Sequence, residues 1–207
     1  ESFQINVSPF DVRQSGFAGG SINAITKSGT NNIEGSAYGF LRNQSLAGKT
    51  PEGLVGDDGE RTKLNDFTSK TYGVRVGGPI IEDKLFYFVN YERQENETPQ
   101  PFDIDNYRGD ATGADLDALS DFLQSNYGYD AGGFDNNTSS LTSDKLIAKI
   151  DWNINENNKL SLKHSYVKAV QLNAPSSNTG SINFFNRAVN FESITNSTAL
   201  ELNTRIG

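Results

Sequence analysis

Apolar and polar residues alternate along several short stretches of the chain, which is the pattern of β-strands that are apolar on one face. In the clearest stretch, Tyr72, Val74 and Val76 fall on one side of the strand, and Gly73 and Arg75 fall on the other. The pattern predicts seven strands, at residues 22–26, 33–42, 71–77, 85–91, 145–153, 160–166 and 194–206.

Residues that favour turns separate these strands. Residues 27–32 interrupt the chain with Ser, Gly and Asn. Gly77-Gly78-Pro79 is expected to end the third strand, because proline cannot donate a hydrogen bond to a neighbouring strand. Short returns are predicted at residues 82–83 and 154–158, and long polar segments at residues 44–69, 93–144 and 168–192.

The second long segment contains the one stretch with a helical period. Leu116, Leu119 and either Phe122 or Leu123 recur at helical spacing, and two aspartates lie where they favour the first turn. We therefore expect a short amphipathic helix at residues 114–127.

The lengths of the connections separate two fold classes that share this alternation. A soluble β-sandwich buries its apolar faces in a core, whereas a membrane β-barrel turns them toward lipid. After the strand at 33–42 the connections run long, short, long, short, long. Outer-membrane barrels sort their loops in this way. Aromatic residues near strand ends also fit the interfacial girdles of a barrel, namely Tyr72, Tyr91, Trp152 and Tyr166.

Composition excludes several classes of protein. The chain has no run of roughly 18 apolar residues, so it does not read as a helical membrane protein. A net charge of -8 argues against nucleic-acid binding, which needs clustered Lys and Arg. The absence of cysteine excludes a disulfide framework and cysteine-based metal or redox chemistry. Much of the acidity lies between residues 92 and 135, where eleven acidic residues accompany two arginines, so this segment reads as solvated.

Two stretches resemble one known family. GGSINAITKSGTN at residues 19–31, followed by GSAYGFLRN at 35–43, is similar to the end of the plug and the first barrel strand of Oar-like TonB-dependent outer-membrane receptors. GVRVGGPIIEDKLFYFVNYE at residues 73–92 resembles the next hairpin of that family. The resemblance is close over about the first half of the chain and rests on architecture in the remainder.

The resemblance implies an all-β fold. Residues 1–30 would be the C-terminal part of a plug domain, and residues 31–207 about the first six strands of an antiparallel transmembrane barrel. Six such strands cannot form a complete barrel by themselves. The two edges of the open sheet would expose backbone donors and acceptors to lipid. The parent would be a plugged barrel of roughly 22 strands, of which this chain is a fragment.

The resemblance also implies a function, a location and partners. The protein would take up a ligand across the bacterial outer membrane, surrounded by lipid and energised by a TonB-type protein that binds a segment outside this chain. Segments 44–69, 93–144 and 168–192 would face outward and contact an extracellular ligand, a surface lipoprotein or another partner. No cofactor is expected.

Two groups of residues are the candidate sites. The junction between plug and barrel would include Gly19, Gly20, Asn23, Thr26, Lys27, Gly29 and Asn31. Ligand or partner contacts in the loops would include Phe184, Phe185, Asp103 and Asp105.

Catalysis is the least expected function. The single histidine, His164, lies on an apolar strand face, and no nucleophile constellation accompanies it. The aspartates near residue 110 offer oxygen ligands for calcium, but Arg108 occupies the position of the EF-hand glycine. We therefore interpret them as an acidic surface loop and expect no metal site.

Two other functions remain open. A receptor-like barrel can serve as a structural or assembly component of an outer-membrane complex without transport. A secreted soluble β-sandwich can bind glycan through Phe184 and Phe185. A parent without a TonB-binding segment would favour the first, and solubility without detergent the second.

Overall fold

A six-stranded antiparallel sheet dominates the computed structural model, which describes residues 2–7, 20–51 and 59–206. Its strands follow sequence order and comprise β3 (Glu34–Asn43), β4 (Thr68–Ile81), β5 (Leu85–Gln100), β6 (Asn137–Asn155), β7 (Asn158–Asn173) and β8 (Val189–Thr204). Strands β1 (Ser2–Val7) and β2 (Gly20–Ile25) pair with each other in a separate small sheet. The six expected strands and the preceding short strand are thus confirmed.

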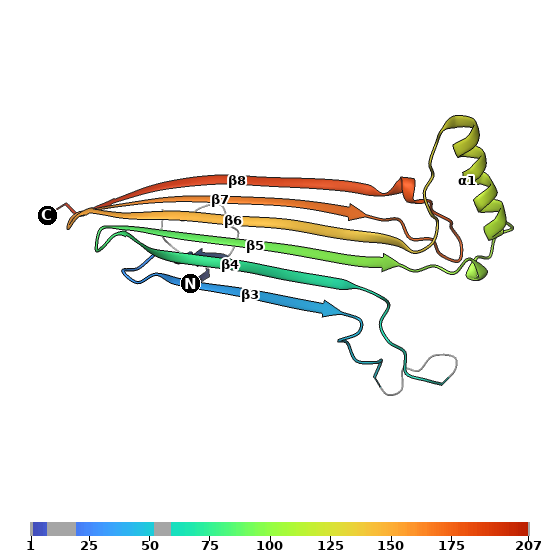
Figure 1. Cartoon of the computed structure of the whole chain (residues 1–207), viewed down its shortest axis with the longest axis horizontal. Coiled ribbons are helices and arrows are strands. Elements are labelled where there is room, and N and C mark those ends of the chain that lie inside the picture. The colour runs from blue at the N-terminus through green and yellow to red at the C-terminus, as the bar shows by residue number, and fades with distance from the viewer. Residues whose placement is uncertain (1, 8–19, 52–58, 207) are drawn as a thin grey trace.

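The two ends of the sheet differ. Short turns join β4 to β5 and β6 to β7 at one end, whereas the connections 44–67, 101–136 and 174–188 leave the other. Figure 1 shows the sheet as a single open layer with the helix α1 (Gly113–Tyr127) at the end opposite the turns. The short 3-10 helices η1 (Ile104–Asn106) and η2 (Phe185–Arg187) belong to the same long connections.

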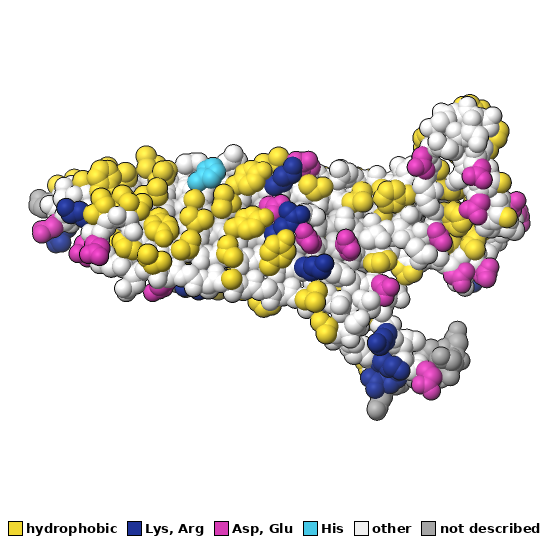
Figure 2. Space-filling view, viewed as in Figure 1, with side chains coloured by type: hydrophobic (Ala, Val, Ile, Leu, Met, Phe, Trp, Pro, Cys, Tyr) yellow, Lys and Arg dark blue, Asp and Glu magenta, His cyan; other side chains and the backbone are white. Residues whose placement is uncertain are grey.

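One face of the sheet is apolar near the turns. Register places Val76, Val89, Ala148 and His164 in one row across four strands. Figure 2 shows this face, where apolar side chains cover the region from the turns to a group of charged residues near the middle. The opposite face is largely polar and includes Arg75, Glu92, Lys145, Lys149, Asp151, Lys163 and Glu201.

The sheet has almost no hydrophobic core of its own. Among the described residues, Phe88, Leu116 and Ala131 are the buried apolar side chains. Val74, Trp152 and Leu200 on the apolar face are 54%, 44% and 69% exposed. A soluble domain of this length buries most of its apolar surface, so the apolar face requires a covering from outside the sheet.

The strands continue beyond their predicted ends. Residues 93–100 extend β5 and residues 137–144 extend β6, so both belong to the ladder and not to a loop. Residues 168–173 likewise belong to β7, residues 189–192 to β8, and Thr68 and Ser69 to β4. The extensions of β5 and β6 carry almost only polar residues on both faces, so no apolar period marks a strand there. The extensions of β7 and β8 do alternate, with Val170 and Leu172 in the first and Val189 and Phe191 in the second, and the prediction missed this signal.

The prediction that Gly77-Gly78-Pro79 ends a strand was wrong. Strand β4 continues to Ile81, and all three residues pair with β5, before a register shift between Pro79 and Ile81. Strand β3 begins opposite Gly77, so β4 has a free edge beyond that residue. A proline is tolerated at such an edge because no partner needs its missing N–H.

The predicted helix is confirmed and has a capping box at its start. The Thr112 hydroxyl accepts a hydrogen bond from the Asp115 N–H, and the Asp115 carboxylate accepts one of 2.8 Å from the Thr112 N–H. Gly128 ends the helix in a left-handed conformation. No helix in the described part of the chain is long and apolar enough to cross a membrane.

Acid is expected to weaken the start of α1. Hydrogen bonds from the Thr112 side chain and backbone to the carboxylate hold the pKa of Asp115 below its usual range. A lowered pKa in the folded state stabilises the helix above the usual value of about 4, and this contribution disappears as the pH falls through the lowered pKa. Hydrogen-exchange protection of residues 113–127, corrected for intrinsic exchange, should therefore fall as the pH drops below about 4.

Two variants isolate the capping box in that measurement. Asp115→Asn should show the low protection already at neutral pH, with little further change in acid. Asp117→Asn alters an aspartate of the same helix outside the capping box and should keep the pH dependence of the parent. Equal behaviour of the two variants would contradict the assignment.

Candidate functional site

Residues 26–33, which we call the junction segment, connect β2 to β3 and cross the polar face of the sheet near its turns. Gly29 lies against the backbone of β4 and β5, Ser28 contacts Lys149 of β6, and Asn31 contacts the β4–β5 turn at Asp83. Residues far apart in sequence are therefore brought together at this end of the sheet.

Gly29 makes the closest approach of the junction segment to the sheet. A Cβ at this position would lie 2.3 Å from the Tyr87 carbonyl oxygen and 2.7 Å from that of Gly78. A Cβ at Gly77 would be in ordinary contact with the Gly29 Cα at 3.5 Å, so the space restriction lies at Gly29 itself. The segment can lie directly on the sheet only because position 29 has no side chain.

Asn31 joins the junction segment to the β4–β5 turn, which is itself bonded to strand β6. Its Nδ2 donates to the Asp83 Oδ1 at 2.6 Å, and its Oδ1 accepts from the Asp83 N–H at 2.8 Å. Asp83 has a φ of 61° in the β4–β5 turn, and its carbonyl accepts from the Asn153 side chain at 3.0 Å. We call the close contact of Gly29 together with this Asn31–Asp83 pair the anchor.

Lys149 makes a second connection, on the N-terminal side of Gly29. Its Nζ donates to the Ser28 Oγ at 2.7 Å and lies 3.1 Å from the Asp151 Oδ1. Lys149 and Lys163 are opposite each other in register, and adjacent like charges destabilise a sheet. Asp151 offsets this repulsion, while its Oδ2 is buried without a hydrogen-bond partner in the described structure.

Two small cavities flank the junction segment. One of about 80 Å³ lies between residues 27–30 and a wall that includes Arg75 and Phe88. The other, of about 220 Å³, separates Ile25 and Thr26 from Lys149, Lys163, Glu201 and their neighbours. Ligand pockets usually measure about 300 Å³ or more, so these spaces are gaps in an interface between two parts of the chain.

A hydrogen-bonded network stiffens the polar face farther from the turns. Tyr38 lies over Gly73, where a Cβ would come within 2.6 Å of its hydroxyl oxygen. The Tyr38 hydroxyl donates to the Glu92 Oε2 at 2.6 Å, and the Lys145 Nζ lies 2.8 Å from the Glu92 Oε1. The network ties β3, β5 and β6 together and leaves both charges paired.

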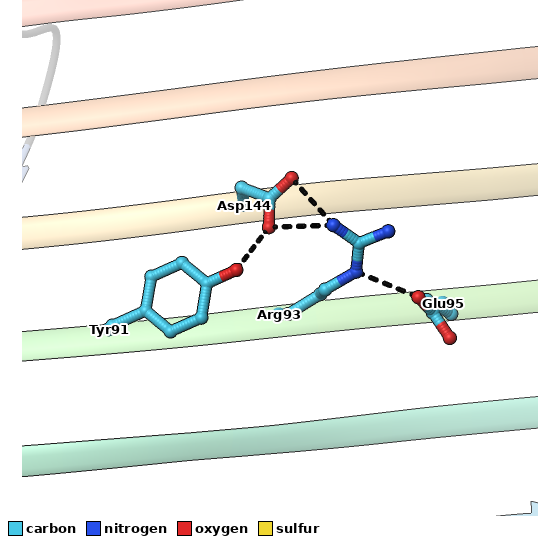
Figure 3. Close-up of polar contacts among 4 residues, drawn as sticks. All are labelled: Tyr91, Arg93, Glu95 and Asp144. Carbon is cyan, nitrogen blue, oxygen red and sulfur yellow. Dashed lines mark hydrogen bonds and ion pairs between the residues drawn. The ribbon is translucent and has the colours of Figure 1, made fainter.

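A row of charged residues borders the apolar region on the other face. The Arg93 Nη1 donates to both Asp144 oxygens at 3.2 and 3.3 Å, and Tyr91 donates to the same carboxylate at 2.6 Å (Figure 3). The Arg93 Nε donates to Glu95 at 2.7 Å. Lys168 and Glu192 add a pair at 3.1 Å. We call these five charged residues the charged row.

The charged row separates two kinds of surface. Between it and the turns, β6 presents Leu146, Ala148, Ile150 and Trp152. Beyond it, the same face of β6 presents Thr142, Ser140 and Thr138. A barrel strand needs about 9–11 residues to cross a bilayer, and the apolar stretch with its flanking residues has about this length.

The long connections 101–136 and 174–188 form one interlocked unit. The Phe185 N–H donates to the Gly133 carbonyl at 2.8 Å, and the Arg108 N–H donates to that of Thr179 at 2.9 Å. Phe134 and Phe184 meet edge to face with ring centroids 5.8 Å apart. Phe184 and Phe185 are half-buried, so these predicted contact residues also hold the two connections together.

The other predicted loop residues have local roles. Asp103 caps η1 by accepting a hydrogen bond of 3.0 Å from the Asp105 N–H. The described residues include no group of three or more acidic, histidine or cysteine side chains that fits a metal ion. His164 lies in the apolar region with its Nδ1 2.9 Å from the Thr198 Oγ1.

The structure places only some of the predicted junction residues in contact with the sheet. Gly29 and Asn31 contact the sheet, and Thr26 and Lys27 line the two cavities. Gly20 and Asn23 lie in β2, and Gly19 lies outside the described residues. Sequence reasoning missed the partners Lys149, Asp83 and Asn153, because no local signal connects them to the segment. The Gly77-Gly78 pair was a usable signal, since two adjacent glycines in a strand indicate a close backbone approach.

Comparisons with known proteins agree with this geometry. Residues 25–106 match the family model described as an outer membrane beta barrel domain. The TonB-dependent transporter Oar of Myxococcus xanthus is 35% identical over 78 residues, which are 35% of this chain and 7% of that protein. The chain thus spans only a small part of the length of this relative. No solved structure matches the chain.

The matches and the open sheet together indicate a bacterial outer-membrane β-barrel with similarity to TonB-dependent receptors. The six strands are a part of that barrel, and lipid is the covering that the apolar face requires.

Proposed function

We propose that the parent protein is a TonB-dependent transporter, in which a plug closes the barrel and the junction segment joins the plug to the barrel wall. The observation that carries this proposal is the course of the chain before β3. It folds back over the polar face of the sheet and is fixed there by Gly29 and Asn31. A chain that enters the lumen in this way is suited to hold a plug.

The two faces of the sheet support the same assignment. In a barrel the polar face lines a wet lumen, and here it carries the Tyr38–Glu92–Lys145 network and Lys149. The turns would then face the periplasm and the interlocked long connections the outside. A ligand would bind on the outer side, and a periplasmic TonB-type protein would rearrange the plug.

Conductance of the full-length parent in planar lipid bilayers tests for a plugged barrel. The intact protein is expected to pass little current, because the plug occupies the lumen. A variant that lacks all residues before position 31 should form a stable open pore. The variant Gly39→Ala, which alters a glycine with no atom within 4 Å of an added Cβ, should behave as the parent does. Equal currents in the intact and shortened proteins would rule out a plug.

A second measurement separates transport from a purely structural role. Cells with and without the protein are grown in a defined medium, and depletion of its components is followed by mass spectrometry. At least one component should disappear faster in cells that have the protein, and a protonophore should abolish the difference. A structural component of an envelope complex would leave every component unchanged.

A further inference from the structure

The junction segment is held differently on the two sides of Gly29. We propose that the anchor at Gly29 and Asn31 stays fixed, whereas the Ser28–Lys149 contact is a latch that opens first and lets the preceding chain pivot at Gly29. The inference rests on the proposed plugged transport and assigns the place at which the plug begins to leave the wall.

The anchor has several simultaneous contacts. Gly29 lies so close to the carbonyl oxygens of Tyr87 and Gly78 that not even a methyl group fits between them. Asn31 makes two hydrogen bonds to one residue, Asp83, which is itself bound by Asn153. Release of this side requires the loss of both hydrogen bonds and of the packing on β4 and β5.

The latch is a single contact. In the described structure, the hydrogen bond from Lys149 to the exposed Ser28 is the polar contact that ties residues 25–28 to the barrel wall. The cavity of about 220 Å³ separates Ile25 and Thr26 from β6, β7 and β8. Among the described strands, β2 pairs with β1 and with none of the large sheet. Ile25 and Ser28 are exposed, whereas Thr26 and Lys27 are half-buried, so packing opposes movement of residues 25–28 only in part.

Lys149 also has another partner available when the latch opens. Asp151 already lies 3.1 Å away through its Oδ1, and its Oδ2 is buried without a hydrogen bond among the described residues. An ammonium group that leaves Ser28 can donate to this second oxygen, which satisfies a polar atom that is otherwise unpaired. The exchange lowers the cost of opening the latch.

Distances between paired spin labels test the two halves of the junction separately. The full-length parent, free of other cysteines, receives labels at Thr26→Cys and Ala199→Cys to follow the latch side. A second sample has labels at Thr30→Cys and Glu82→Cys to follow the anchor. Ser28→Ala should raise the open fraction in the first pair on the order of tenfold, which is the effect of losing one hydrogen bond to a charged donor. The second pair should keep its distance.

Two further variants complete the design. Lys149→Met combined with Asp151→Asn removes the donor without leaving an unpaired carboxylate, and should act as Ser28→Ala does. Asn31→Ala should broaden the Thr30–Glu82 distance. The inference is overturned if Ser28→Ala changes both pairs together, or if neither latch variant changes the Thr26–Ala199 pair.

This measurement uses purified protein without ligand or energising partner. Its outcome is therefore independent of the conductance and depletion experiments, which test the transport function. A barrel that proves to be unplugged would refute the proposed function even if the two halves of the junction move separately.

Discussion

Gly29→Ala is expected to lift the junction segment off the sheet while leaving the barrel intact. The added Cβ would fall 2.3 Å from a backbone oxygen of β5 and 2.7 Å from one of β4, so it has no flexible neighbour to displace. Overpacking of this kind costs about 1–3 kcal/mol. Since local opening exposes the chain to proteases, trypsin cleavage after Lys27 should accelerate roughly 5- to 150-fold.

The matched control is another glycine of the same region of the chain. Gly39 lies in β3, and no heavy atom is within 4 Å of an added Cβ there. Gly39→Ala should leave the cleavage rate after Lys27 unchanged. In both variants the change of gel mobility on heating, which reports a closed barrel, should match that of the parent. Equal cleavage of Gly29→Ala and the parent would show that the close contact does not hold the segment.

Ile150→Arg is expected to destabilise the barrel strongly, because Ile150 lies in the middle of the apolar region and its side chain is 41% exposed. In a membrane this exposure is to lipid. A cationic residue on the lipid face costs about 2–4 kcal/mol at the bilayer midplane and about 0–1 kcal/mol near its surface. Equilibrium unfolding of the full-length parent in lipid vesicles, followed by tryptophan fluorescence, measures the loss.

Thr142→Arg provides the comparison on the same face of the same strand. Thr142 lies beyond the charged row and opposite Glu95 in register, so the new cation meets an aqueous surface and an acidic neighbour. Its cost should stay within about 1 kcal/mol. If both arginines were equally tolerated, the apolar face would not be in lipid and the soluble alternative would regain support.

The charged row explains why the strands are longer than their apolar stretches. Arg93, Asp144 and Glu95 are paired with each other, as are Lys168 and Glu192. Paired charges suit the boundary between lipid and water better than the lipid interior does. Beyond the row, β5 and β6 continue for several residues with polar side chains on both faces, so the ladder extends past the membrane and the loops start farther out.

The sequence alone determined where the strands of the large sheet lie along the chain, which face is apolar, and where the helix is. Strands that face lipid carry an apolar side chain at every second position, and this alternation located them, as in β4 from Tyr72 to Val76. Helical spacing of the leucines, together with two aspartates at the N-terminal end, marked α1 within two residues of its true start. These features are local, and local side-chain chemistry is sufficient to specify them.

Only the tertiary structure decided how far the strands extend and what the junction segment touches. The polar extensions of β5 and β6 are strands because their backbones pair with each other. Backbone pairing does not require an apolar residue at every second position, so the sequence carries no sign of it. The partners of the junction segment lie 52 residues away for Asn31 and 121 residues away for Ser28. Such contacts follow from sheet register and from the absence of a side chain at Gly29, which no local pattern of residues records.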